Sequence, residues 1–272
     1  MASKLRRPTV GAFLLHHPVF TIADAERALG GEGGKQRTIK RLRYHVDQRR
    51  ARSVAHEVYV AIPPGVDPDS FQPDRYLVAA AVRSDGVLAY HAALELLGAA
   101  HSDWGVCSVL TEKPRAPVLL GTVRIEFLPH PAALRRPHGQ LLGVRTIDRL
   151  GRNLPVTGPE RTLLDGFRHP DRVGGLEELV ESAAGFGVLD LRLLRRLLEV
   201  YAEKRLWAAA GWFLERHRER FFVSDDYLAA LEPHRPASPR YLARGARGGK
   251  LLPRWNLIVP AALARAGEAD DT

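Results

Sequence analysis

The sequence contains a single cysteine, Cys107, among 272 residues. One thiol cannot form an intramolecular disulfide, and it cannot supply a zinc site built from several cysteines. Cys107 lies in the apolar run 106–110, so we expect a small buried side chain there. The hydrophobic content of 45% supports a sizeable core.

Long hydrophobic runs are missing as well. No apolar run approaches the eighteen residues that a membrane-spanning helix requires. Basic residues stand near the N-terminus, but Pro8 and Pro18 interrupt the apolar residues after them, and no secretory segment is predicted. A basic head that lies on a membrane surface is disfavoured, because no long apolar face accompanies the charge. We therefore expect a soluble, cytoplasmic protein without a membrane partner.

The common catalytic and metal-binding motifs do not occur. The eleven histidines include no H-x-x-x-H or H-E-x-x-H pair, and a G-x-S-x-G elbow is absent. The glycine-rich segment 245–251 fails the P-loop pattern, since Arg244 replaces a required glycine and Leu251 replaces Ser or Thr. His91 and Glu95 share a helix face, but no third metal ligand is evident.

We accordingly predict a protein without enzymatic activity, metal or cofactor. One enzymatic alternative stays open, in which Glu112 and Glu126, near the ends of predicted strands, hold Mg²⁺ for nuclease chemistry.

Acidic residues are scarce in the segment 35–52, where Asp47 stands alone among eight basic residues. Ile39, Leu42 and Val46 are spaced three and then four apart, which predicts one apolar stripe of an α-helix. Cations on the opposite face suit phosphates, while Arg, Gln and Tyr suit base edges in a major groove. A solvated surface helix is the alternative. The predicted outward residues are Arg37, Lys40, Arg41, Tyr44 and Gln48.

The flanking segments favour DNA binding. Thr21 and Asp24 have the spacing of a capping box, which predicts a short helix over 22–29. The glycine run 30–34 then makes a turn, either a loose one or one whose N–H groups approach a phosphate. With a helix over 10–15 and strands at 53–54 and 58–62, the order predicts a winged helix-turn-helix. The candidate DNA-binding residues are Lys35, Gln36, Arg37, Thr38, Lys40, Arg41, Tyr44, Gln48, Arg52 and His56.

The charge distribution supports two domains. Residues 1–62 hold twelve Lys/Arg and five Asp/Glu, whereas the remainder holds 28 and 26. This pattern fits a nucleic-acid-binding head on a nearly neutral body. Four prolines between residues 62 and 74 predict a linker. We predict a DNA-binding domain at 1–62, a linker at 63–74 and a mixed α/β domain at 75–272, an α+β protein overall.

Within the predicted body, hydrophobic patterning gives an order of elements. Helices are expected at 75–82, 88–97, 176–184, 191–201 and 206–217, with a further helix starting at Pro159. Strands are expected at 106–111, 118–120, 123–128, 140–147, 153–156 and 255–259.

Five segments of the body, in this order behind the predicted winged helix, resemble the AbiEi family of antitoxins from type IV toxin–antitoxin systems. They are 90–98, 157–165, 172–179, 211–215 and 254–260. The resemblance covers nearly the whole chain, and the order of the motifs carries it. We expect structural roles for its polar and aromatic residues: a buried ion network of Glu160, Arg161 and Asp165, and core positions for Trp212 and Trp255.

The resemblance implies a repressor that binds inverted repeats of double-stranded DNA in its own operon. It also implies an antitoxin that counters a nucleotidyltransferase-type toxin without needing a stable complex. The other reading is a transcription regulator that senses a small ligand and has no toxin partner.

Overall fold

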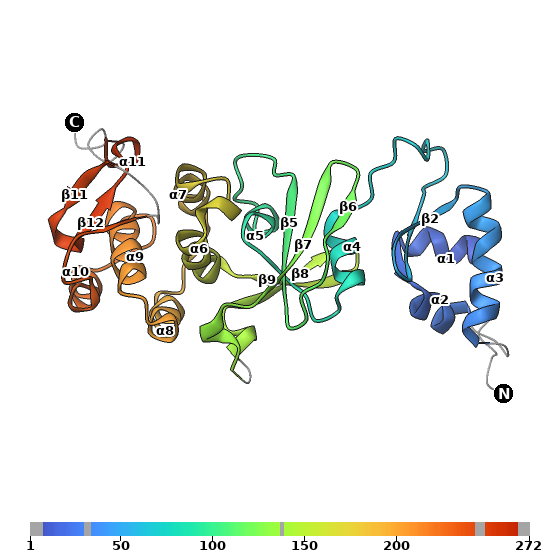
Figure 1. Ribbon diagram of the computed structural model, residues 1–272, viewed down its shortest axis with the longest axis horizontal. Coiled ribbons are helices and arrows are strands. Elements are labelled where there is room, and N and C mark those ends of the chain that lie inside the picture. The colour runs from blue at the N-terminus through green and yellow to red at the C-terminus, as the bar shows by residue number, and fades with distance from the viewer. Residues whose placement is uncertain (1–7, 30–33, 137–138, 243–247, 266–272) are drawn as a thin grey trace. The chain divides into compact units, whose positions relative to one another are not determined.

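The computed structural model describes residues 8–29, 34–136, 139–242 and 248–265. The fold is mixed α/β, with helices and several sheets along the chain (Figure 1). None of the helices formed by these residues is long and apolar enough to cross a membrane. Contacts divide the chain into two compact units. The first comprises 1–86, 105–129 and 148–154, and the second comprises 87–104, 130–147 and 155–272.

The first unit begins with three helices and a small antiparallel sheet. Strand β3 lies in the centre of this sheet, between β1 and β2. The β2–β3 hairpin contains a bulge between Ser53 and Ala55 and turns at His56 and Glu57. The elements are α1 (Val10–His16), β1 (Val19–Thr21), α2 (Ile22–Leu29), α3 (Gly34–Asp47), β2 (Ala51–Ala55) and β3 (Val58–Ala61).

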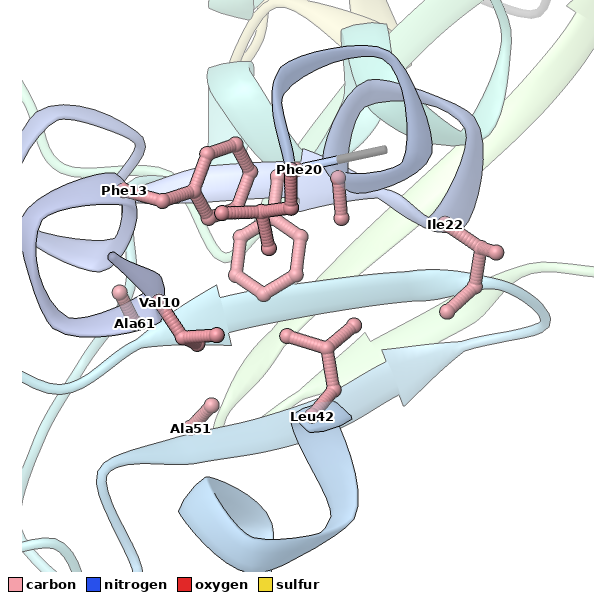
Figure 2. Packing of buried hydrophobic residues seen from close by; sticks show 9 residues of the cluster. Val10, Phe13, Phe20, Ile22, Leu42, Ala51 and Ala61 are labelled. Carbon is pink, nitrogen blue, oxygen red and sulfur yellow. The ribbon is translucent and has the colours of Figure 1, made fainter. Parts of the chain in front are cut away.

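One hydrophobic cluster holds these elements together (Figure 2). Phe13 of α1 and Phe20 of β1 meet edge to face, with ring centroids 5.0 Å apart. Leu42 of α3 is buried in the cluster, and Ile39 and Val46 pack against it half-buried. The predicted apolar stripe of this helix therefore faces the core. The other buried members are Val10, Ile22, Ala25, Leu29, Ala51 and Ala61.

A reciprocal capping box starts α2, as the sequence predicts. The backbone N–H of Thr21 donates to Asp24 Oδ2 at 2.9 Å, and the N–H of Asp24 donates to Thr21 Oγ1 at 3.1 Å. Burial by itself would raise the pKa of Asp24, but the hydrogen bonds from Thr21 and the charges of Arg152 and Arg27 outweigh burial and lower that pKa.

The remainder of the first unit includes three strands and one helix that lie wholly within it. Strand β7 pairs in parallel with β5 and antiparallel with β6. Ile125 and Phe127 are buried while Arg124 is exposed, so side chains on β7 alternate between the core and solvent. The elements are α4 (Arg75–Val82), β5 (Val106–Thr111), β6 (Val118–Leu120) and β7 (Val123–Pro129). Cys107 is fully buried on β5, as expected.

Polar contacts attach the proline-rich segment 63–74 to the rest of the first unit. Arg52 donates to the carbonyl oxygens of Pro68 and Phe71 at 3.3 and 3.0 Å. Asp74 caps α4 and accepts from Arg149 Nε at 2.5 Å. Helix α4 in turn contacts β1 and β3. The predicted division into residues 1–62 and 75–272, joined by a linker, is a statement about independent folding, and it stays a prediction.

The second unit is largely helical. In its sheets, Leu88 of β4 pairs in parallel with Val156 of β9, and β12 lies between β10 and β11. Its strands are β4 (Val87–Ala89), β10 (Arg240–Tyr241), β11 (Lys250–Leu252) and β12 (Leu257–Val259); β8 (Val144–Arg149) and β9 (Arg152–Thr157) contribute residues to both units. Its helices are α5 (His91–Leu96), α6 (Pro159–Arg168), α7 (Leu176–Ala184), α8 (Leu191–Tyr201), α9 (Lys204–Arg216), α10 (Asp225–Leu231) and α11 (Ala261–Arg265).

The helix predicted over 88–97 is wrong in its first part. The chain forms strand β4 and then the shorter helix α5, with Tyr90 between them at a φ of 57°. All three residues of β4 are buried, so neither a period of two nor one of 3.6 distinguishes strand from helix in this short run.

The structure also shifts three other boundaries. Helix α3 ends at Asp47, because Arg49 has a φ of 55° and turns the chain into β2. The late strand starts at Leu257, after a 3₁₀ turn that contains Trp255. The expected strand at 140–147 begins with a 3₁₀ turn and becomes β8 only at Val144. Strand β1 and helix α10 were not expected from the sequence.

A close approach between α9 and Trp255 requires a glycine. A Cβ added at Gly211 would lie 2.2 Å from the Trp255 ring, which is fully buried. The indole Nε1 donates to Glu215 Oε2 at 2.6 Å and fixes the position of the ring. Because the ring has no freedom to move away, only glycine fits at position 211.

We therefore expect Gly211→Ala to destabilise the protein by about 1–3 kcal/mol through overpacking, despite the higher helix propensity of alanine. Urea unfolding followed by circular dichroism measures this loss. Gly11→Ala in α1 is the matched control, since the nearest atom to an added Cβ is Thr9 Oγ1 at 4.0 Å. Equal stability of the two variants would contradict the packing argument.

Candidate nucleic-acid interface

Helix α3 presents a cationic face because its apolar stripe is buried. Leu42 is 2% exposed, and the residues on the opposite side of the helix all reach solvent. Tyr44 is 59% exposed among the cations. Four predicted contact residues lie on this side, namely Arg37, Lys40, Arg41 and Tyr44, and Gln48 is exposed directly after the end of the helix.

Lys35 joins the start of α3 to the hairpin turn. Its ammonium forms an ion pair with the carboxylate of Glu57, and the Glu57 carbonyl accepts from the N–H of Ile22 at 3.0 Å. The hydrogen bond from Lys35 lowers the pKa of Glu57. A lysine in the first helical turn opposes the helix dipole, so the nearby carboxylate offsets an unfavourable charge. Lys35 thus has a structural partner as well as an exposed position.

Two further candidate residues contact the scaffold. Arg41 Nη1 donates to the carbonyl oxygen of Leu29 at 3.0 Å, which satisfies an unpaired acceptor at the end of α2. Thr38 is only 4% exposed, and its hydroxyl lies 3.4 Å from the Gly34 carbonyl oxygen. Thr38 therefore lies on the core side of α3, away from the cationic face.

The remaining candidates lie in the first turn of α3 and beyond its C-terminal end. Gln36 and His56 are exposed, the latter in the hairpin turn. Arg52 uses its guanidinium to hold segment 63–74. Arg43 is an exposed cation of α3 that was not among the predicted contacts. Its position on the flank of the helix, between the stripe and the outward face, explains why the stripe alone did not identify it.

Of the glycine run 30–34 before α3, the structure describes Gly34. Residues 30–33 lie outside the described part of the chain, and so do residues 245–247 of the glycine-rich segment 245–251. Gly34, the first residue of α3, has a φ of 55°, a conformation that favours glycine.

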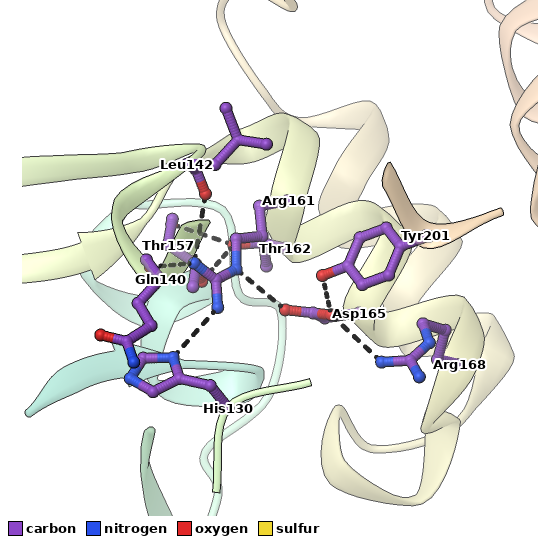
Figure 3. Close-up of polar contacts among 9 residues, drawn as sticks. All are labelled: His130, Gln140, Leu142, Thr157, Arg161, Thr162, Asp165, Arg168 and Tyr201. Carbon is purple, nitrogen blue, oxygen red and sulfur yellow. Dashed lines mark hydrogen bonds and ion pairs between the residues drawn. The ribbon is translucent and has the colours of Figure 1, made fainter. Parts of the chain in front are cut away.

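A second polar cluster, in the second unit, is enclosed (Figure 3). Glu160, Arg161 and Asp165 have no exposed surface, as expected, but the expected network is divided: Arg161 pairs with Asp165, whereas Glu160 pairs with Arg145. Arg161 Nη1 donates to the carbonyl oxygens of Gln140 and Leu142 at 2.7 and 3.1 Å, and its Nε donates to Asp165 Oδ2 at 3.4 Å.

Asp165 has two other partners. Tyr201 of α8 donates its hydroxyl to Asp165 Oδ1 at 2.6 Å, and Arg168 Nη1 lies 3.8 Å from the same oxygen. Burial, reinforced by the charge of Asp165, raises the pKa of the Tyr201 hydroxyl well above its usual value. The charged groups are shielded from solvent, and their hydrogen bonds are made within the protein. The arrangement therefore connects α6 to α8 and does not form an open site.

Glu160 occupies a similar enclosed position at the start of α6. Its Oε1 accepts from the N–H of Asp190 at 2.7 Å and from Arg145 Nη2 at 3.1 Å, which joins the loop before α8 to β8. Trp255 is fully buried and Trp212 is 6% exposed, so the expected core positions of both are confirmed.

The pair of His91 and Glu95 belongs to a packed cluster. His91 is 1% exposed, and its Nδ1 lies 3.4 Å from Glu95 Oε1 while its Nε2 lies 3.6 Å from Glu178 Oε1. The ring also stacks on Trp104. Nowhere in the described ranges do three or more His, Cys, Asp or Glu side chains form a group that could hold a metal ion.

Comparisons with known proteins show a similarity of fold and nothing beyond it. Neither a protein-family model nor a curated protein matches the chain. Among solved structures, the crystal structure of the Rv2827c protein from Mycobacterium tuberculosis is similar, with a TM-score of 0.58 and 22% sequence identity. The match covers 96% of this chain and 95% of that one. At this identity the similarity shows a shared fold along nearly the whole chain.

The buried network gives a stability prediction. Arg161→Met leaves Asp165 and two carbonyl groups short of their buried donor, so we expect a loss of about 3–5 kcal/mol. The four tryptophans (104, 207, 212 and 255) all belong to the second unit, so their fluorescence in urea reports on its unfolding.

Arg195→Met provides the control for this variant. Arg195 forms an exposed ion pair with Glu199 on α8, and its loss should cost less than about 1 kcal/mol. If the two variants lost the same free energy of unfolding, the Arg161 network would not be an important stabilising element.

Proposed function

We propose that residues 8–62 form a winged helix-turn-helix that binds double-stranded DNA through α3. The support comes from the order of elements: three helices are followed by an antiparallel hairpin, around one hydrophobic cluster. In such a domain the third helix enters the major groove and the hairpin lies against the backbone. The exposed His56, in the hairpin turn, is then placed for a phosphate contact.

The observation that carries this proposal is the exposed face of α3 opposite Leu42. Arg37, Lys40 and Tyr44 reach solvent there, in a segment of the chain with a strong excess of basic residues. Cations supply the affinity for phosphates, and Arg37 and Gln48 have the donor groups that read base edges. Lys35, Arg41 and Arg52 contribute charge while they hold the scaffold.

The proposed biological role is that of an operon repressor and antitoxin. One copy of α3 would read one half-site, so inverted repeats would be bound by two copies of the chain. The antitoxin function against a nucleotidyltransferase-type toxin rests on the AbiEi resemblance of the sequence. The motifs that carry the resemblance lie in the second unit, where Glu160, Arg161 and Asp165 are fully buried.

DNA binding is tested with Arg37→Ala and Lys40→Ala. If Arg37 reads a guanine, its loss should weaken binding to the DNA upstream of the protein's own reading frame by about 1–3 kcal/mol. Loss of Lys40, a phosphate contact, should weaken binding to all sequences and lower the slope of log affinity against log salt by about 0.9. Fluorescence anisotropy over a salt series measures both effects.

Arg192→Gln is the matched control for these substitutions. Arg192 is an exposed arginine of α8, in the second unit, and its loss removes one charge from the whole protein. The proposal fails if the two α3 variants, shown to be folded by circular dichroism, bind DNA as tightly as this control.

Antitoxicity is tested by growth of cells that co-express the adjacent gene. We expect the full-length protein to restore growth, and the double variant R37A/K40A to restore it as well when expressed from an independent promoter. The full chain is used because residues 75–86 belong to the same compact unit as 1–62. Rescue by the wild type alone would show that neutralisation acts through repression, and absence of rescue by both would remove the antitoxin role.

A further inference from the structure

A cavity of about 620 Å³ lies beside the C-terminal end of α3, within the first unit. Its walls come from α1, from the last turn of α3 and the residues after it, and from the segment that leaves β3. This volume is in the range of sites that bind small molecules. The cavity is separate from the outward face of α3, although Gln48 borders both.

The cavity combines an apolar wall with a cationic one. Leu14, Leu15, Ile62 and Val66 line the apolar wall, and Leu15 is 66% exposed although it is a large hydrophobic residue. Contact with water is unfavourable for such side chains, so an apolar body that covered them would be stabilised there.

Two side chains of the cationic wall have nitrogen atoms without a hydrogen-bond partner in the described part of the chain. No Asp or Glu is among the lining residues, whereas His45, Arg49 and Arg50 are. Arg49 is already paired with Asp69. The Arg50 guanidinium has no hydrogen-bond or ion-pair partner within the described ranges, and the buried Nδ1 of His45 has no hydrogen-bond partner there. A guanidinium and an imidazole that line the same cavity are suited to a carboxylate.

We propose that this cavity binds a small amphipathic carboxylate, with its apolar body against Leu14, Leu15 and Val66 and its carboxylate on Arg50 and His45. Burial and the charge of Arg50 lower the pKa of His45, which favours a neutral imidazole that can donate one N–H. Since His45 belongs to α3, an occupant would contact the helix that presents the cationic face. Binding itself does not depend on the proposed DNA-binding role.

Isothermal titration calorimetry with octanoate and decanoate, in the absence of DNA, tests the site directly. We expect saturable binding of at least one of these acids and at least tenfold weaker binding of the uncharged octanamide than of octanoate. Arg50→Gln should weaken carboxylate binding by about tenfold or more, because a charge-assisted hydrogen bond is lost. Arg192→Gln, which removes a distant charge, should bind like the wild type.

A second variant fills the cavity from its apolar side. Gly11 lines the cavity, and the nearest atom to an added Cβ there is 4.0 Å away, so a Cβ is accommodated and Gly11→Leu is designed to compete with the ligand. We expect this variant to stay folded by circular dichroism and to lose carboxylate binding.

Three results would overturn the proposal. The first is no saturable binding of either acid at millimolar concentration. The second is unchanged binding by Arg50→Gln and folded Gly11→Leu. The third is a dimer, detected by sedimentation, that Gly11→Leu abolishes while neither acid binds the wild type, since a second copy of the chain would then occupy the groove. A loss of DNA binding by the α3 variants would leave all these measurements unaffected.

Discussion

The burial of Leu42 decides how the first unit presents its charge. Once this side chain enters the cluster formed by Phe13 and Phe20, the helix cannot rotate without exposing it to water. The opposite face, with Arg37, Lys40 and Tyr44, is thereby turned outward. A hydrophobic contact therefore sets the direction of the electrostatic surface, and the proposed DNA contacts depend on it more than on any polar bond.

The cations of this region have two kinds of role. Lys35 and Arg41 contact Glu57 and the end of α2, and these bonds fix the angle of α3 against its neighbours. Lys40 projects from the outward face, where a solvated ligand can reach it. Substitutions in the first group should change stability and binding together, whereas Lys40 should change binding alone. The distinction matters because a mutational scan of basic residues without stability controls could not separate a loss of stability from a loss of binding.

In the second unit, by contrast with the exposed face of α3, a group of charged side chains is buried. Arg161 and Asp165 are buried and satisfied by carbonyl groups, by Tyr201 and by each other. Such a network contributes little net stability relative to an apolar core, yet it penalises every arrangement that leaves one partner unpaired. It specifies how α6 and α8 pack.

The sequence alone determined two local features of the first unit. The spacing of Ile39, Leu42 and Val46 predicted the outward face of α3, and the Thr21–Asp24 spacing predicted the capping box of α2. Three features could be seen only in the tertiary structure. They are the burial of Thr38, the hydrogen bond from Arg52 to segment 63–74, and the strand at Val87–Ala89. The physical reason is that these outcomes depend on partners far away in the chain, which periodicity within one element cannot report.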